Sequence, residues 1–213
     1  HYSAWDSING GWYNSINKFG QPNNINEDKS AFNQHYALLG ISAFAEANKD
    51  SLAEFRLEDT WIDNAAILWD QDEINFGYFD RGNYDYSQLT GKSFNATVDA
   101  LTTHLFSLYL QEENEFIYTQ NIQFVMDNIL ERLIPSMDNQ AIGFAEEYNT
   151  DWSVKSNETM TIMGHLLKTA WCLGRAYHID NNPEFIAGAE KIIDNVLLKG
   201  YDHQNGGPYK DYN

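Results

Sequence analysis

The sequence predicts an all-α fold, in which helical hairpins pack side by side as a toroid and short β-like segments connect them. Two observations support this prediction. A glycine-and-aromatic segment recurs four times along the chain, and two stretches with apolar residues at helical spacing fill each interval between the copies. One hairpin cannot bury its apolar face alone, so such units pack into a solenoid or close into a ring.

The recurring segments each carry a glycine, then aromatic or proline positions, then polar residues. They lie at residues 10–14, 76–80, 142–146 and 206–210, and we name them the rim segments. Their anchor glycines are spaced by 66, 66 and 64 residues and are Gly11, Gly77, Gly143 and Gly207. We therefore expect one domain over residues 1–213. Its repeats lie at about 10–75, 76–141 and 142–205, and a fourth begins at 206–213.

The helical patterns divide into an inner and an outer set. Predicted inner helices span 31–48, 94–111 and 157–178, and predicted outer helices span 51–70, 114–134 and 183–199. Pro135 should end the second outer helix, because proline removes a backbone donor, and Gly200 should end the third. In a ring the inner helices converge around a central pocket, and the rim segments lie beside it.

The composition narrows the range of partners. A formal net charge of −18 and a pI near 4.4 exclude nucleic acid as a partner and disfavour anionic membrane surfaces. No run of 18 apolar residues is present. Aromatic residues make up 15% of the chain. They either fill the core or line a groove for sugars, whose C–H faces suit flat apolar rings.

The cysteine content and the first residue bear on the compartment. Cys172 is the one cysteine, which excludes an internal disulfide, and it lies in an apolar helical run. The chain begins at His1 rather than Met, so we expect a processed or excised segment. Asn95 and Asn157 begin N-glycosylation patterns. An extracellular or periplasmic location is favoured over a cytoplasmic one.

Two stretches resemble the N-acylglucosamine 2-epimerase superfamily, which includes cellobiose 2-epimerases and mannose isomerases. Residues 29–39 resemble its signature of a lysine before a helix that opens with a Tyr-Asp-Gln-Ala-Phe-like run. Residues 163–171 are similar to its Gly-His-x-x-Glu-x-x-Trp run. The resemblance implies an (α/α) barrel of six or seven hairpins. Three hairpins are about half of it, so further chain or self-assembly would complete the ring.

The resemblance also implies a reaction, sugar 2-epimerisation or aldose–ketose isomerisation. Such a reaction moves a proton at the carbon beside a carbonyl, and histidine is suited to that work near neutral pH. In the family two histidines do so, and His165 matches one of them. The family's Glu is replaced here by Lys168, and Asp99 stands where the family tends to have its preceding histidine, with His104 about one turn later. The predicted catalytic residues are therefore His165, His104 and Asp99.

Two interpretations of the position of His165 are possible. Asn157, Thr161, His165 and Lys168 are spaced to share one helix face, which would line the pocket. The other reading is a core histidine bonded to neighbouring backbone. The expected ligand is a mono- or oligosaccharide. Its predicted binding residues are Trp12, Tyr13, His35, Tyr78, Lys168 and Trp171.

Two other functions remain open. A glycoside hydrolase of the same toroid type needs two carboxylates, and candidates are Asp80, Asp85, Asp99, Glu146, Glu147 and Asp151. A non-catalytic carbohydrate-binding or structural protein is the third reading, favoured by Lys168 and the incomplete ring. We expect no cofactor, since phosphate-loop, dinucleotide and zinc-helix motifs are missing. We expect no metal, because residues 70–73 lack EF-hand spacing and suit a solvated acidic loop.

Overall fold

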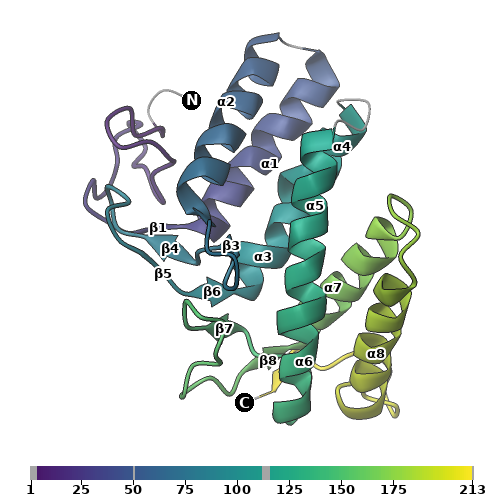
Figure 1. Cartoon of the computed structure of the whole chain (residues 1–213). Coiled ribbons are helices and arrows are strands. Elements are labelled where there is room, and N and C mark those ends of the chain that lie inside the picture. Colours follow the sequence, from purple (N-terminus) through teal and green to yellow (C-terminus); the bar gives the residue numbers. More distant parts are fainter. Residues whose placement is uncertain (1–3, 50, 112–115, 213) are drawn as a thin grey trace.

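The computed structural model describes residues 4–49, 51–111 and 116–212 and contains three helical hairpins packed side by side (Figure 1). The inner helices are α1 (Ala31–Asn48), α3 (Phe94–Ala100) with its continuation, and α7 (Met163–Ala176). The outer helices are α2 (Ser51–Leu68), α5 (Phe116–Asn128) with its continuation, and α8 (Pro183–Lys199). The predicted hairpin architecture is confirmed.

The second hairpin contains two π-helical turns. Helix α3 continues through η1 (Leu101–Leu105) into α4 (Phe106–Gln111), and α5 continues through η2 (Ile129–Leu133) into α6 (Ile134–Ser136) and the 3-10 turn η3 (Met137–Asn139). Neighbouring units touch through both sets of helices, since α1 contacts α3 and η1, α3 contacts α7, and α8 contacts η2.

Short antiparallel strand pairs gather at the N-terminal ends of the inner helices (Figure 1). Strand β1 (Lys29–Ser30) pairs with β4 (Arg81–Gly82), which also pairs with β5 (Leu89–Thr90). Strand β6 (Lys92–Ser93) pairs with β7 (Glu147–Tyr148), and β8 (Thr161–Ile162) pairs with β9 (Asp211–Tyr212). Within the second unit, β2 (Trp69–Asp70) pairs with β3 (Gly77–Tyr78). Each strand that leads into an inner helix thus pairs with a strand that follows the next unit's rim segment.

The second, third and fourth rim segments each cap the inner helix of the unit before them. The third residue after the anchor glycine accepts a hydrogen bond from the first residue of that helix. The donor–acceptor pairs are Ala31 N to Asp80 O (2.9 Å), Phe94 N to Glu146 O (3.0 Å) and Met163 N to Lys210 O (3.1 Å). Because the first N–H groups of a helix have no partner within it, these bonds fix the rim against the helix ends.

Two of the anchor glycines clearly have no room for a side chain. At Gly143 the backbone has φ +62°, and a Cβ atom would lie 2.6 Å from both Leu166 Cδ1 and Thr161 Cγ2. Gly77, at φ +125°, would bring its Cβ within 2.5 Å of Asn128 Nδ2. Backbone conformation and close packing therefore both require glycine at these two positions.

Two predicted helix boundaries are wrong. The third inner helix begins at Met163 and ends at Ala176, so Asn157 and Thr161 do not share a helix face with His165. Thr161 lies in β8 instead, because this stretch pairs with β9. The first outer helix ends at Leu68, since Trp69 and Asp70 form β2.

A further predicted boundary is also wrong, because Pro135 does not end the second outer helix. The proline lies in α6, directly after the π-helical turn η2. In that turn Ile134 N bonds Ile129 O, so the hydrogen-bonding pattern has already shifted by one residue before the proline. The shifted register accommodates a residue without a backbone donor, and the helix continues into η3.

The core lies between the inner and outer helices. It includes Phe94, Leu101, Leu105, Phe144, Leu166, Leu173 and Phe185, all at most 1% exposed. Among the described residues, no helix combines the length and the apolar character that a membrane crossing requires.

Candidate functional site

The described residues bring His165 and Glu146 together at the rim. His165 Nδ1 lies 2.7 Å from Glu146 Oε2. The His165 side chain is 26% exposed, whereas that of Glu146 is 6% exposed. The second carboxylate oxygen, Oε1, accepts a hydrogen bond from Ile162 N (3.0 Å), at the start of α7. The carboxylate is thus held from two directions, and one edge of the imidazole stays accessible.

Aromatic stacking fixes the plane of the imidazole. The His165 ring stacks on Phe94 with a centroid distance of 3.9 Å and an interplanar angle of 9°. Phe94 in turn stacks on Phe144 at 6.0 Å, and both phenylalanines are fully buried. The imidazole therefore forms the outer layer of a stack that begins in the core.

An ion pair lies one helical turn further along α7. Lys168 Nζ donates to Asp99 Oδ1 in a close ion pair. The lysine side chain is 26% exposed and the aspartate side chain 2%. Lys168 Nζ also lies 5.9 Å from the Phe94 ring centroid and 6.0 Å from that of Tyr36. His165 and Lys168 thus flank the same phenylalanine.

The repeat explains why these residues meet. Tyr36, Asp99 and Lys168 each lie seven residues after the residue that opens a strand before an inner helix, namely Lys29, Lys92 and Thr161. Equivalent positions of the three inner helices therefore converge. Burial raises the pKa of Asp99, and its bond to Lys168 opposes that rise.

His104 and His35 lie in the core rather than beside His165. They are 1% and 0% exposed, and their ring centroids are 5.2 Å apart. His35 Nε2 lies 3.0 Å from Ala96 O, and His104 Nδ1 lies 2.9 Å from Thr103 Oγ1. Burial lowers the pKa of His35 to about 4 and that of His104 well below its usual value, so both rings are neutral.

The predicted aromatic binding residues lie at separate places. Tyr78 is 1% exposed and packs edge-on against His35 at 4.9 Å, and burial raises its pKa. The backbone of Trp12 exchanges two hydrogen bonds with the Gln34 side chain, and its own side chain is nearly buried. Tyr13 is half-buried over the Lys29 ammonium, at 5.6 Å.

Trp171 lies at the other end of the inner helices. It is 51% exposed, contacts Phe106 edge-on at 6.1 Å and lies under the Arg175 guanidinium at 5.4 Å. These three residues line an open cleft of about 560 Å³, which also involves the ends of α1 and α4. Since Trp171 follows His165 by six residues on α7, it is displaced by about 9 Å along the helix.

The structure adds three residues that sequence reasoning did not assign to this site. Glu146 appeared only among the acids considered for hydrolysis, Tyr36 only in a helical pattern, and Phe94 only in a predicted helix. For Glu146 a signal existed, because it ends a rim segment and rim segments lie beside the pocket.

The other acids considered for hydrolysis have local structural roles. Asp85 and Asp151 accept bonds from Ser87 and Ser153 in turns, Asp80 pairs with Arg81, and Glu147 pairs with Lys155. Among the described residues, no three histidines, cysteines or acids are grouped as a metal site would require.

Comparisons with known proteins show the family and the fold. A family model described as N-acylglucosamine 2-epimerase (GlcNAc 2-epimerase) matches residues 2–212. A solved D-mannose isomerase has a TM-score of 0.82 and 20% identity, over 98% of this chain and 52% of its own. The cellobiose 2-epimerase of Bacillus thermoamylovorans B4167 has a TM-score of 0.81 and 14% identity, over 98% of this chain and 54% of its own.

More distant structures share the same fold. A family 76 α-mannanase of Bacteroides thetaiotaomicron has a TM-score of 0.70 and 12% identity, over 97% of this chain and 54% of its own. No curated relative matches the chain. The chain thus spans about half the length of the solved structures that it resembles, which corresponds to about half of their toroid.

Proposed function

The chain belongs to the N-acylglucosamine 2-epimerase family, and from that premise we propose that it forms half of a sugar epimerase or isomerase in which His165 moves the proton. The observation that supports this role is the contact of 2.7 Å between His165 Nδ1 and Glu146 Oε2. A carboxylate can only accept, so Nδ1 carries the hydrogen. Nε2 is then left with its lone pair and acts as the base.

The reaction begins at the carbon next to the sugar's carbonyl group. His165 Nε2 takes the proton from C2, and the electrons of that C–H bond move toward the carbonyl oxygen, which gives an enediolate. Glu146 stabilises the imidazolium that forms, and the Phe94 ring holds its plane. Lys168, one turn away and partly exposed, donates a hydrogen bond to the enediolate oxygen.

The two products differ in where the proton returns. Delivery from His165 to C1, with transfer of a hydroxyl proton from O2 to O1, gives the ketose and needs one base. Delivery to the opposite face of C2 gives the 2-epimer and needs a second proton donor. His104 was predicted for that second role, and its burial and its contacts with Thr103 and His35 place it in the core. The described groups therefore suit the one-base isomerisation best.

Deuterium incorporation tests this proposal. The purified protein is incubated with mannose, N-acetylglucosamine or cellobiose in D₂O, and NMR follows deuterium at C1 of a ketose and at C2 of the aldose, together with the products. We expect exchange and isomer formation, and we expect His165→Gln to lower the rate by about 10²- to 10⁴-fold, the usual contribution of a proton-transfer group. His178→Gln is the matched control, because that histidine is exposed and follows α7.

Three outcomes separate the alternatives. Exchange that survives in His165→Gln would contradict the assignment of this residue. Release of reducing sugar from mannan oligosaccharides without exchange at C2 would favour a hydrolase. Sugar binding without either reaction would indicate a non-catalytic protein.

A further inference from the structure

The first two units contain a buried lysine that fills the space under the rim loop. Lys29 Nζ donates to Asp6 Oδ2 (2.8 Å) and Gly10 O (2.7 Å). Lys92 Nζ donates to Asp70 Oδ2 (2.9 Å) and Gly77 O (2.9 Å). Both side chains are at most 1% exposed. We name this arrangement the lysine cage.

The third unit keeps the short strand before its inner helix, but no lysine opens that strand. Thr161 takes its place, because it opens β8 as Lys29 opens β1, and it follows its anchor glycine by the same 18 residues. Thr161 Oγ1 donates to Ile142 O at 2.8 Å. Ile142 precedes Gly143 as Gly10 precedes Gly11, so the hydroxyl bonds the carbonyl equivalent to the one that Lys29 reaches in the first unit.

The third unit also has no carboxylate in the position that the lysine cage requires. Asp138 lies five residues before its anchor glycine, as Asp6 does in the first unit. Its side chain is 70% exposed and pairs with Lys191 on α8 at 3.1 Å. Neither the long side chain nor its acidic partner occupies the interior of this unit.

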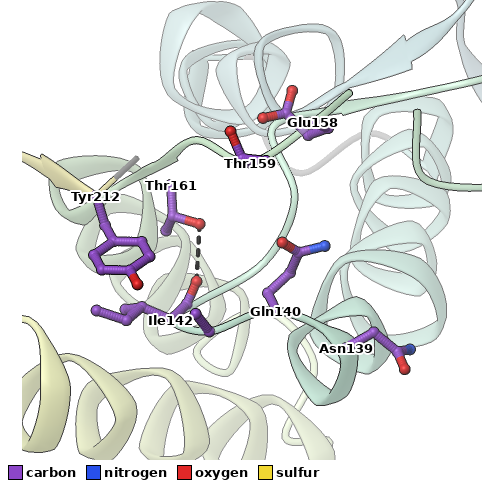
Figure 2. A pocket seen from close by; sticks show the side chains of 8 residues that line it. Asn139, Gln140, Ile142, Glu158, Thr159, Thr161 and Tyr212 are labelled. Atoms are coloured by element: carbon purple, nitrogen blue, oxygen red, sulfur yellow. Dashed lines mark hydrogen bonds between the residues drawn. The ribbon is translucent and has the colours of Figure 1, made fainter. Parts of the chain in front are cut away.

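An open cavity of about 420 Å³ lies in this place. Figure 2 shows the Thr161–Ile142 hydrogen bond at its wall and Gln140, Glu158 and Tyr212 around the open space. The complete lining comprises Asn139, Gln140, Ala141, Ile142, Glu158, Thr159, Thr161 and Tyr212. Its volume falls in the range of about 300–1,000 Å³ that is usual for small-molecule sites.

The lining has the chemistry of a site for a neutral polyhydroxylated ligand. No lysine or arginine lines it, and Glu158 is its one acid, so neither an anion nor a metal ion is favoured. The side chains of Asn139, Gln140, Thr159 and Tyr212 make no hydrogen bond with other described residues. Amides and hydroxyls both donate and accept, as sugar hydroxyls require, and the Tyr212 ring offers an apolar face.

We propose that this cavity is a second saccharide-binding site, distinct from the His165 site and created by the exchange of a cage lysine for Thr161. It binds one sugar residue through the amides of Asn139 and Gln140, the hydroxyl of Thr159 and the ring of Tyr212. The site does not depend on catalysis at His165.

Two-dimensional ¹H–¹⁵N NMR tests the proposal in the His165→Gln protein, in which we expect the sugar to be turned over slowly. Mannose, N-acetylglucosamine and cellobiose are titrated separately. We expect saturable shifts at the amides of residues 139–142, 158–161 and 212. Thr161→Lys should weaken this binding at least tenfold, because the longer side chain occupies the cavity. Thr161→Ser, the matched control, keeps the short hydroxyl and should bind as the parent does.

Three results would contradict the second binding site. Shifts confined to the amides around Gly164 and Lys168, or no shifts at all, would overturn the second site and leave the proposed reaction untouched. Binding unchanged by Thr161→Lys would overturn it as well. If that variant does not fold, Tyr212→Leu replaces it, and undiminished binding in Tyr212→Leu would be equally contradictory.

Discussion

The second and third units are both helical hairpins behind a rim segment, but they differ at the positions of the proposed site. In the second unit Asp80 Oδ1 accepts from Ser93 Oγ (2.6 Å), and Ser93 caps α3 through a bond from Ala96 N (3.0 Å). In the third unit Glu146 takes the place of Asp80, and Ile162 takes that of Ser93 without a side-chain cap. The longer carboxylate bonds Ile162 N itself and also reaches His165.

The comparison shows that equivalent carboxylates can hold different partners in the two units. Both carboxylates lie at the N-terminus of the next inner helix, where the helix dipole favours negative charge. In the second unit that carboxylate supports a helix cap. In the third it orients an imidazole, because one extra methylene and the loss of the capping serine free it for a new partner. Lys92 and Thr161 occupy equivalent positions and differ in a similar way. The lysine fills the interior of its unit, whereas the shorter threonine lines a cavity.

The largest expected difference between the units concerns the cage. Lys92→Met leaves the Asp70 carboxylate and the Gly77 carbonyl without their ammonium partner, so we expect a loss of about 3–5 kcal/mol in the free energy of unfolding. Thr161→Val removes one neutral hydrogen bond and should cost about 1 kcal/mol. Urea denaturation of both variants measures the two losses, and equal losses would contradict the cage comparison.

The second prediction concerns the pKa values of the two histidines in the core. The pKa values of His35 and His104 are depressed by burial, so the unfolded chain binds more protons below pH 6.5 than the folded one. The stability that these groups provide is fully present above about pH 6.5 and is lost as the pH falls toward 4. The slope is up to about 1.4 kcal/mol per pH unit for each histidine.

His104→Leu sharpens this prediction, because Leu173 is the buried residue at the equivalent position of the third inner helix. The free energy of unfolding, measured by urea titration at several values between pH 4 and 7, should fall less steeply in the variant. An unchanged slope would show that His104 does not contribute to acid sensitivity.

The third difference concerns the two rim carboxylates. Glu146→Gln keeps the side-chain shape but loses the charge that stabilises the His165 imidazolium. We expect kcat to fall about 10- to 100-fold, less than the loss of a proton-transfer group itself. KM should change little, because Glu146 is nearly buried and orients His165 rather than the sugar. Asp80→Asn is the matched control, and an equal fall there would indicate a general effect on the rim.

The smallest expected effect concerns the helix caps. Ser93→Ala removes the N-cap of α3 and should cost about 1 kcal/mol of unfolding free energy. Ser30→Ala at α1 should cost the same, because Ser30 accepts from Asn33 N in the same way. Thermal unfolding compares the two, and a much larger loss at Ser93 would indicate that its bond to Asp80 adds stability.

Much of the fold was readable from local pattern. The three hairpins, the short segments between them and the family resemblance were correct, because each depends on residue patterns that can be recognised in the sequence alone. The start of α7 was not, since Thr161 pairs with a strand some 50 residues later. The seven-residue offset of Tyr36, Asp99 and Lys168 was present in the repeat, but only the curvature of the packed helices brings these three together.

The sequence by itself determined the repeat, the hairpins and His165 as the residue to examine, because these depend on residue identity and spacing. Only the tertiary structure decided that His35 and His104 are buried, that Glu146 orients His165, and that Thr161 leaves a cavity where Lys29 and Lys92 fill theirs. The physical reason is that burial, ion pairing and cavity volume depend on side chains from different units. Their distances are fixed by helix packing and not by separation along the chain.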